Sequence, residues 1–354
     1  MLPEYRYAEV AIRLLLGQAD SQLLLDPLSN DVNWNIFLSL TQKNRVPIRL
    51  YESFVKLGFQ PGEVYQNFVN AERARIKNMV VLMGELNKML DKSGIDFVYM
   101  KNYQHYPDMG EDIDLFVNTR TKKVDSIFIN TLKAKPHKRT LLNKIGGKTQ
   151  YTLDGWPFEI EIHHGRMGSM GEHIIFTKYL VANRRNANID GVELWVPSPE
   201  DQFIVQVLQR VYGRFYFRIS ELVYVINAVL MERFDWDYIV KIAKLMGIFD
   251  GLQLYLSNVE LIYQNIMNKS LPCINSVFPA PRRIPAKIKF SDSHYRIPLQ
   301  TVVTTLYIKK LFLDIKALRY FVVVRTLLLP FFTILVIFKN VIRNVSKTLA
   351  LNVL

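Results

Sequence analysis

Residues 111–117 read Glu-Asp-Ile-Asp-Leu-Phe-Val, and this stretch decides the kind of fold that the chain forms. The run from Ile113 to Val117 is short and apolar, which is typical of a buried strand. Side chains alternate along a strand, so Asp112 and Asp114 point to one face while Ile113 points to the other. Two carboxylates this close repel each other, so either one is protonated or a cation neutralises them. Because oxygen ligands favour a hard ion such as Mg²⁺, the stretch predicts a metal site. The alternative is a strand whose aspartates only accept hydrogen bonds from nearby backbone N–H groups.

A second acidic strand is predicted farther along the chain, at residues 159–163 (Glu-Ile-Glu-Ile-His). Strict alternation places Glu159, Glu161 and His163 on one face and the two isoleucines on the other. A strand with one face in water has the same pattern, so this strand alone does not identify a site. Together, however, the two strands predict a site of three carboxylates. Metal-assisted phosphoryl transfer uses such an arrangement.

Around these strands the apolar pattern divides the chain into four regions. We expect helices in residues 1–92, a mixed α/β unit in 93–197, helices packed on that unit in 198–272, and a basic, apolar helical tail in 273–354. Strand-like runs lie at 95–100, 113–117, 149–153, 158–163 and 192–196, with an Asp154–Gly155 hairpin signal between two of them. Ser198 is a predicted helix cap. The predicted fold class is α+β, a small mixed sheet flanked by N-terminal and C-terminal helical regions.

Composition excludes several classes of protein. The chain has 354 residues, of which 49% are hydrophobic and 22% charged, values typical of a globular protein and not of a disordered or fibrous one. A single cysteine, Cys273, excludes an intrachain disulfide and a cysteine-rich zinc site. Glu4 and Glu9 interrupt the first apolar run, so we expect no secretory signal. A reducing compartment fits these features, and the expected location is the cytoplasm.

Charge is concentrated at the C-terminal end. The whole chain carries a net charge of +13, and residues 281–354 hold 13 Lys or Arg against two acids, which leaves only +2 for the first 280 residues. Such a tail is expected to meet an anionic membrane, a protein partner or nucleic acid, or else to pack on its own body. Tyr320–Phe338 has one charge, Arg325, and Pro330 near its middle. It predicts either a membrane-spanning helix, and so membrane association through the tail, or a buried helix.

The motifs in the middle of the chain resemble those of a known family. Lys101-Asn102, Tyr106, Asp112-Ile113-Asp114-Leu115 and Glu161-Ile162-His163-His164 are similar to the pattern L-K-G … Y … D-I-D-L … h-[DE]-h-H, in which h is apolar. This pattern is that of an uncharacterised bacterial and archaeal nucleotidyltransferase family within the DNA polymerase β superfamily. Pro197-Ser198-Pro199-Glu200-Asp201 is similar to a third segment of the family. The resemblance covers roughly residues 80–230 and implies a small nucleotidyltransferase core.

The resemblance also implies a reaction and roles for particular residues. A Mg²⁺- or Mn²⁺-dependent enzyme of this kind moves a nucleoside monophosphate from a nucleoside triphosphate such as ATP to an acceptor hydroxyl. Asp112 and Asp114 would hold the metal ions, and Glu161 would be the third ligand and general base, with Glu159 as the fallback. Lys101 would reach the triphosphate, with Asn102 forming the turn beside it.

The sequence leaves alternatives open. Asn102 stands where the superfamily places a glycine, so a protein that keeps the fold and binds without transferring, possibly at a membrane through its tail, is the second reading. A sugar-nucleotide glycosyltransferase that uses Asp112 and Asp114 as its metal motif is a weaker third. The acceptor is open as well, since a protein side chain, an RNA end, a sugar phosphate and a small alcohol all suit the same core.

Other polar residues carry weaker signals. We expect His163 and His164 to be ordinary hydrogen-bonded histidines or to orient a ligand. The basic stretch 133–148 could steer an anion, although a solvated loop explains it as well. Arg210 and Arg214 lie on the helix after Ser198, where they face either the nucleotide cleft or solvent.

Overall fold

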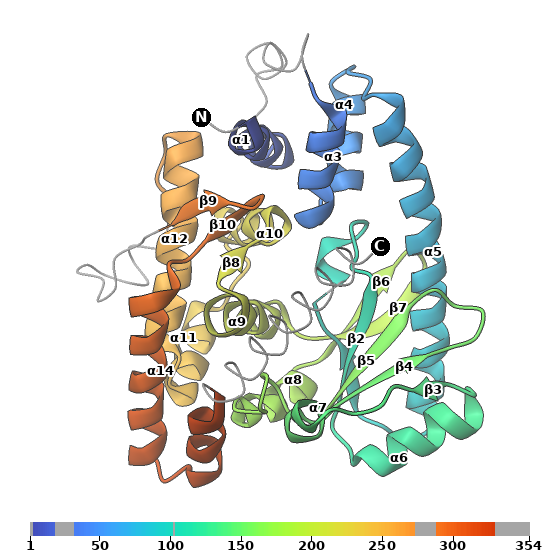
Figure 1. Cartoon of the computed structure of the whole chain (residues 1–354), viewed down its shortest axis with the longest axis vertical. Coiled ribbons are helices and arrows are strands. Elements are labelled where there is room, and N and C mark those ends of the chain that lie inside the picture. The colour runs from blue at the N-terminus through green and yellow to red at the C-terminus, as the bar shows by residue number, and fades with distance from the viewer. Residues whose placement is uncertain (1–2, 18–31, 102, 273–287, 330–354) are drawn as a thin grey trace, which may run out of the picture.

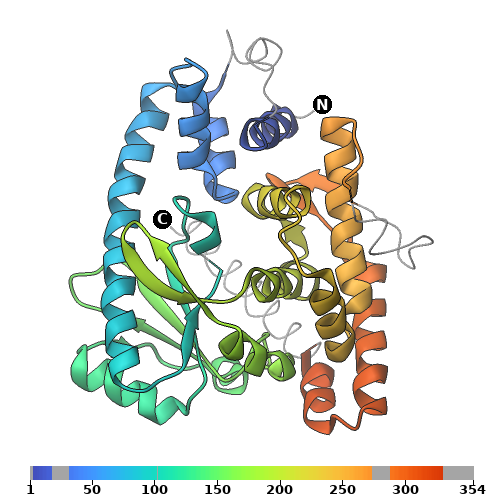
Figure 2. The same cartoon turned by 180° about the vertical axis from the view of Figure 1, so that it is seen from behind.

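The computed structural model describes residues 3–17, 32–101, 103–272 and 288–329. Figure 1 shows a sheet beside the long helix α5 (Glu63–Lys92) on one side of the molecule and a group of helices from α9 (Pro199–Gln209) to α14 (Leu299–Lys316) on the other. The view from behind in Figure 2 shows the same division, with α1 (Pro3–Leu15) and its neighbours at one end. The site described below lies between these two sides.

The central sheet has the strand order β1-β2-β5-β4-β3. Its strands in that order are β1 (Phe97–Tyr99), β2 (Asp112–Val117), β5 (Glu159–His164), β4 (Lys148–Thr152) and β3 (Lys135–Pro136). β2 and β5 run parallel, and the other neighbouring pairs are antiparallel. The predicted α+β class with a mixed sheet is therefore confirmed, and the two acidic strands are direct neighbours.

The two faces of this sheet have different surroundings. Tyr99 in β1 pairs with Leu115 in β2, so their side chains share a face. The hydroxyl of Tyr99 donates to the backbone carbonyl of Met83 in α5 at 2.7 Å, which shows that this face packs on α5. Because side chains alternate along a strand, Asp114 and Glu161 point to the opposite face.

Short helices connect the strands of the core. They are η1 (Tyr103–His105) after β1, α6 (Thr121–Ser126) and η2 (Ile127–Thr131) after β2, α7 (Leu141–Gly146) before β4, and η3 (Ile174–Phe176) and α8 (Thr177–Ala182) after β5. The strands β6 (Arg185–Ile189) and β7 (Val192–Val196) form a separate two-stranded sheet. This hairpin packs closely on α5, because a Cβ atom at Gly84 would lie 2.7 Å from Cγ1 of Val192.

A carboxylate from the core fastens one of the N-terminal helices. These helices include α3 (Trp34–Lys43) and α4 (Pro47–Lys56), and the N-cap residue of α4, Val46, makes no side-chain hydrogen bond. Asp108, between β1 and β2, instead supplies the carboxylate that accepts hydrogen bonds from the N-terminus of α4. Its Oδ1 accepts from the backbone N–H of Ile48 at 2.7 Å, and its Oδ2 accepts from Nε of Arg49 at 2.7 Å. Negative charge at a helix N-terminus is stabilising, so Asp108 joins α4 to the core.

The helices after the core begin where the sequence predicts. The side chain of Ser198 accepts from the backbone N–H of Asp201 at 3.1 Å and so caps α9. The π-helical turn η4 (Arg210–Arg214) and the strand β8 (Tyr216–Phe217) follow α9, and then come α10 (Ile219–Leu230), α11 (Trp236–Met246) and α12 (Phe249–Met267).

The tail is only partly helical, which differs from the expectation for residues 273–354. The strands β9 (Lys289–Ser291) and β10 (His294–Arg296) form a hairpin, and β10 also pairs with β8. Asn44, at the end of α3, connects this hairpin to the body. Its Nδ2 donates to the carbonyl of Ser293 at 2.8 Å, and its Oδ1 accepts from the backbone N–H of Ile219 at 3.0 Å.

The apolar run Tyr320–Phe338 is described as far as residue 329, and its remainder lies outside the described residues. Residues 320–329 are helical, and Arg325 is buried against the body. Its Nη1 donates to the carbonyl of Ile145 at 2.8 Å and also to that of Met170. Within the described ranges, no helix combines the length and the apolar character needed to cross a bilayer.

Candidate active site

The register of the two acidic strands brings the predicted carboxylates together. Asp112 pairs with Glu159, and Asp114 pairs with Glu161. One ligand atom each from Asp114, Glu161 and His163 lie within 4.8 Å of one another, and we call these three residues the ligand trio. Asp112 lies outside the trio and lines the same cavity. Of the three predicted ligands, Asp114 and Glu161 thus belong to the trio, and Asp112 lines the cavity beside them.

Two lysines neutralise the carboxylates of the ligand trio. Nζ of Lys101 lies 2.5 Å from Oδ1 of Asp114, and Nζ of Lys148 lies 2.8 Å from Oε1 of Glu161. All four side chains are at most one-quarter exposed. Lys101 follows β1 and has a φ of 72°, a left-handed conformation that is uncommon for a residue other than glycine. The turn after the first strand therefore places a lysine directly beside the acids.

The surroundings shift the pKa values of the two aspartates in β2 in opposite directions. Burial and the charge of Asp114 raise the pKa of Asp112. Burial acts in the same direction on Asp114, but Lys101 and the hydrogen bond to His163 lower the pKa of Asp114 to about 2. The pKa of Glu161 is also held well below its ordinary value, because His163 and Lys148 outweigh the effect of burial. Paired carboxylates require either that one is protonated or that a cation neutralises them. For Asp114 the neighbouring cation is the ammonium group of Lys101.

The two histidines point to different faces of the sheet. Nε2 of His163 lies 2.8 Å from Oε1 of Glu161 and 3.4 Å from Oδ1 of Asp114. Nε2 of His164 lies 3.0 Å from the hydroxyl of Thr149 on the other face, and burial lowers the pKa of His164 to about 4. The alternation of the strand predicts that one histidine shares the face of Glu161. The closeness of His163 to both carboxylates goes beyond the supporting role expected from the sequence.

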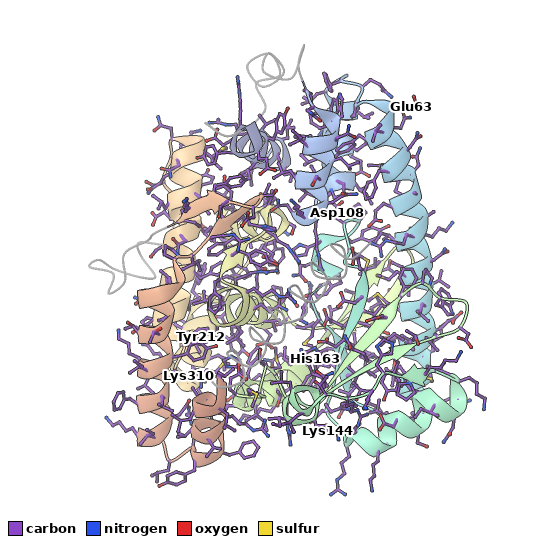
Figure 3. The ribbon with its side chains drawn as sticks, viewed as in Figure 1. Glu63, Asp108, Lys144, His163, Tyr212 and Lys310 are labelled. Carbon is purple, nitrogen blue, oxygen red and sulfur yellow. The ribbon has the colours of Figure 1, made fainter. Side chains whose placement is uncertain are left out.

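The ligand trio opens into a cavity of about 520 Å³ between the sheet and the helices. Figure 3 shows His163 on the sheet side of this space and Tyr212 on the helix side. The polar lining residues that the helix side contributes are Gln206, Gln209, Arg210, Tyr212, Arg214, Arg218 and Glu221. A cavity of this volume is in the range of small-molecule sites.

Positive charge also lines the cavity. We refer to Arg45, Arg210, Arg214 and Arg218, all of which line the cavity, as the arginine group. The buried Arg210 donates from Nη2 to Oε1 of Glu221 at 2.5 Å. Burial and the charges of Arg45 and Arg210 lower the pKa of Arg218 to about 10, so these guanidinium groups are close enough to repel one another. A wall of this kind attracts anions.

Other residues singled out in the sequence lie in different places. Asn102 falls outside the described residues. Glu159 is exposed and is not among the residues that line the cavity. From the basic stretch 133–148, Lys148 reaches the cavity, whereas Lys135 pairs on the surface with Asp154 at 2.7 Å.

Several residues of the cavity wall were not predicted from the sequence. Arg45 and Arg218 come from segments far from the acidic strands, and no local pattern marks them. Glu172 and His173 also line the cavity. Glu172 accepts from the backbone N–H of Met170 at 2.8 Å in a tight loop. The Gly-x-x-Gly-x-x-Gly spacing at 165–171 is a turn signal that could have identified this loop, because all three glycines have left-handed backbones.

The match to a family profile covers the part of the chain that forms this site. The sequence profile of a family described as uncharacterised nucleotidyltransferase matches residues 30–264, a range that includes the ligand trio and the arginine group. The crystal structure of an antigenic nucleotidyltransferase-like protein from Paracoccidioides brasiliensis is similar, with 16% sequence identity and a TM-score of 0.35 over 57% of this chain and 96% of that one. No curated protein matches the chain. Because the profile spans well over half of its residues, the chain belongs to the uncharacterised nucleotidyltransferase family.

Proposed function

We propose that the protein transfers a nucleoside monophosphate from a nucleoside triphosphate to an acceptor hydroxyl and that pyrophosphate leaves. A divalent ion, Mg²⁺ or Mn²⁺, would be held by Asp112 and the ligand trio. The observation that carries the proposal is the convergence of Asp114 and Glu161, each with its own lysine, on the wall of one cavity. Membership of the family supports the reaction class.

The residues of the site suit a hard divalent ion. Two carboxylates and one imidazole lie within 4.8 Å of one another, close to the roughly 4 Å that opposite ligands of one octahedral Mg²⁺ span. Asp112 also fits, because positive charge beside it would relieve the repulsion from Asp114 that raises its pKa. When bound, such an ion stabilises the negative charge that develops on the transferring phosphate.

Cations on both walls suit a triphosphate. Lys101 and Lys148 lie on the sheet side of the cavity, and Arg210, Arg214 and Arg218 lie on the helix side. A triphosphate between the walls would meet positive charge from both directions. The planar guanidinium of Arg214 or Arg218 can donate two parallel hydrogen bonds to phosphate oxygens, which would orient the triphosphate for in-line attack.

A proton must leave the acceptor hydroxyl, and Glu161 with His163 offers a place for it. The low pKa of Glu161 makes its carboxylate a weak base. Oε1 of Glu161 lies 2.8 Å from Nε2 of His163 and 2.8 Å from Nζ of Lys148, so the second oxygen of this carboxylate would take the proton as the general base. This role is the one that the sequence predicts for Glu161.

The test is incubation of the protein with triphosphates labelled at the α-phosphate, ATP first, in the presence of Mg²⁺ and a cell extract that supplies the acceptor. We expect wild-type protein to label an acceptor and Asp114→Asn to reduce labelling about 100-fold or more, because that change removes a charge from the transition-state site. Glu159→Gln, which removes the same charge from an exposed residue two positions before Glu161, should retain activity. Equal labelling by Asp114→Asn and the wild type would refute the proposal.

A protein that binds nucleotides without transferring them is the second candidate. The observation in its favour is that Lys101 and Lys148 already neutralise both carboxylates of the trio. Titration calorimetry separates the two cases. A transferase should bind triphosphate more tightly with Mg²⁺ than without it, whereas binding that ignores Mg²⁺, together with no labelled product, would support the second candidate.

A further inference from the structure

The exposed apolar side chains of the protein are unevenly distributed. Half of the large hydrophobic residues that are exposed in the described ranges lie within residues 308–327. We call them the apolar surface, and they are Ile308, Phe312, Leu313, Ile315, Leu318, Tyr320, Phe321, Val324 and Leu327. Their exposed fractions run from 44% to 69%. A concentration of this kind marks an interaction surface.

The spacing of these residues shows two helical stripes. Ile308, Phe312 and Ile315 follow the i, i+4, i+7 spacing of one helix face in α14. Tyr320, Val324 and Leu327 repeat that spacing in the helix of residues 320–329. Each helix therefore presents an apolar face to the outside.

The opposite faces of both helices are fixed to the protein. Lys310 and Asp314 in α14 are buried, and Nζ of Lys310 lies 2.5 Å from Oδ2 of Asp314. In the next helix Val322 and Val323 are buried, and Arg325 binds two backbone carbonyls of the body. A partner can therefore contact these two helices only on their solvent-exposed faces, because their other faces are packed against the protein.

None of the residues of the apolar surface lines the cavity. Figure 1 and Figure 2 both show α14 at the outer edge of the helical side, with the following helix beside its lower end. Occupation of this edge would leave the cavity between sheet and helices accessible.

Charge and chain direction indicate what the partner is. The exposed Lys316 lies among the apolar residues, and residues 281–354 carry 13 Lys or Arg against two acids. The described chain ends at residue 329, and the sequence continues with Pro-Phe-Phe-Thr-Ile-Leu-Val-Ile-Phe and then Lys339, Arg343 and Lys347, with no acid. Apolar side chains flanked by cations are the combination that binds the interface of an anionic bilayer.

We propose that the apolar surface docks the protein on the face of an anionic lipid bilayer. Phe312, Leu318 and Phe321 would enter the boundary between headgroups and acyl chains, and the exposed Lys316 among them would meet lipid phosphates. This inference does not depend on the proposed function, since it concerns a different surface and needs no nucleotide.

The experiment is sedimentation of the full-length protein with vesicles of two compositions, phosphatidylcholine alone and equal amounts of phosphatidylcholine and phosphatidylglycerol. We expect binding to the mixed vesicles that weakens at high salt, and little binding to phosphatidylcholine alone. Phe312→Ser combined with Leu318→Ser should weaken binding roughly tenfold or more, because two inserted side chains are lost. Both residues are more than 60% exposed, so the fold should tolerate the change.

A matched control tests whether any loss of exposed apolar area has the same effect. Val64→Ser combined with Met231→Ser removes side chains of 53% and 57% exposure from other elements and should bind vesicles like the wild type. Failure of the wild type to bind mixed vesicles, or equal binding by the Phe312/Leu318 variant, would overturn the proposal. Concentration-dependent association of the free protein that the same variant abolishes, without vesicle binding, would instead assign the surface to a second copy of the chain.

Discussion

At the scale of single residues, neighbouring carboxylates in the site repel one another, and lysine side chains beside two of them offset this repulsion. Asp112 and Asp114 come from one strand face, and Nζ of Lys101 lies 2.5 Å from Oδ1 of Asp114. Burial and the charge of Asp114 raise the pKa of Asp112, whereas Lys101 and the hydrogen bond to His163 outweigh burial and lower the pKa of Asp114. The sequence motif predicted the repulsion, because it depends only on alternation along a strand. It did not predict which aspartate Lys101 would neutralise, because that depends on the left-handed turn after β1.

His105 allows a test of the buried charge around the arginine group. Burial, with added repulsion from Arg49 and Arg45, holds the pKa of His105 well below its usual value, so the folded protein keeps this residue neutral. In the unfolded chain this residue takes up a proton below about pH 6.5, so His105 alone should lower the free energy of unfolding by about 1.4 kcal/mol per pH unit below that value. Urea unfolding above and below pH 6.5 measures how the free energy of unfolding depends on pH. His105→Gln should reduce this slope by about 1.4 kcal/mol per pH unit, the contribution of one proton. An unchanged slope in the variant would contradict the assignment.

At the scale of elements, predictions succeeded where the signal is local. The helix cap Ser198 and the strands β2 and β5 follow from residues that are neighbours in the sequence. The parallel pairing of β2 with β5 could not be predicted with the same certainty, because it depends on how the chain between them folds back. For the same reason Arg45, which precedes the acidic strands by a whole helical region, was missed.

Substitutions of the residues that cap α9 and α4, Ser198 and Asp108, compare a local contact with a distant one. Ser198→Ala removes a local cap and should lower the free energy of unfolding by about 1 kcal/mol. Asp108→Ala removes a distant carboxylate that serves Ile48 and Arg49 and should cost about 3 kcal/mol, because buried donors lose their partner. Chemical denaturation of both variants measures the two costs. Equal costs would show that Asp108 acts only as an ordinary cap.

At the scale of the whole molecule, residues 288–329, the described part of the tail, are joined to the body. The hairpin of β9 and β10 pairs with β8, and Arg325 binds the carbonyls of Ile145 in α7 and of Met170 in the loop after β5. The composition of the tail indicated that it meets something anionic or packs on its own body. The sequence could not show that the helix of residues 320–329 has one face buried against the protein and an apolar face outward.

Arg325→Ala should loosen this attachment. The variant loses two hydrogen bonds to backbone carbonyls, so the helix of residues 320–329 should separate from the body more often. Limited trypsin digestion should then cut after Lys316 several times faster than in the wild type. Arg233→Ala, at an exposed position, serves as the control and should be cut at the wild-type rate. Equal rates for Arg325→Ala and the wild type would show that this arginine is not an anchor.

The contacts of Asn44 have a consequence for how the protein is made. Asn44 is held by Ser293 and Ile219, and its neighbour Arg45 belongs to the arginine group. A ribosome releases the acidic strands long before it has synthesised Ser293. The nascent chain therefore carries the carboxylates of β2 and β5 before Asn44, the neighbour of Arg45, can make its contact with Ser293.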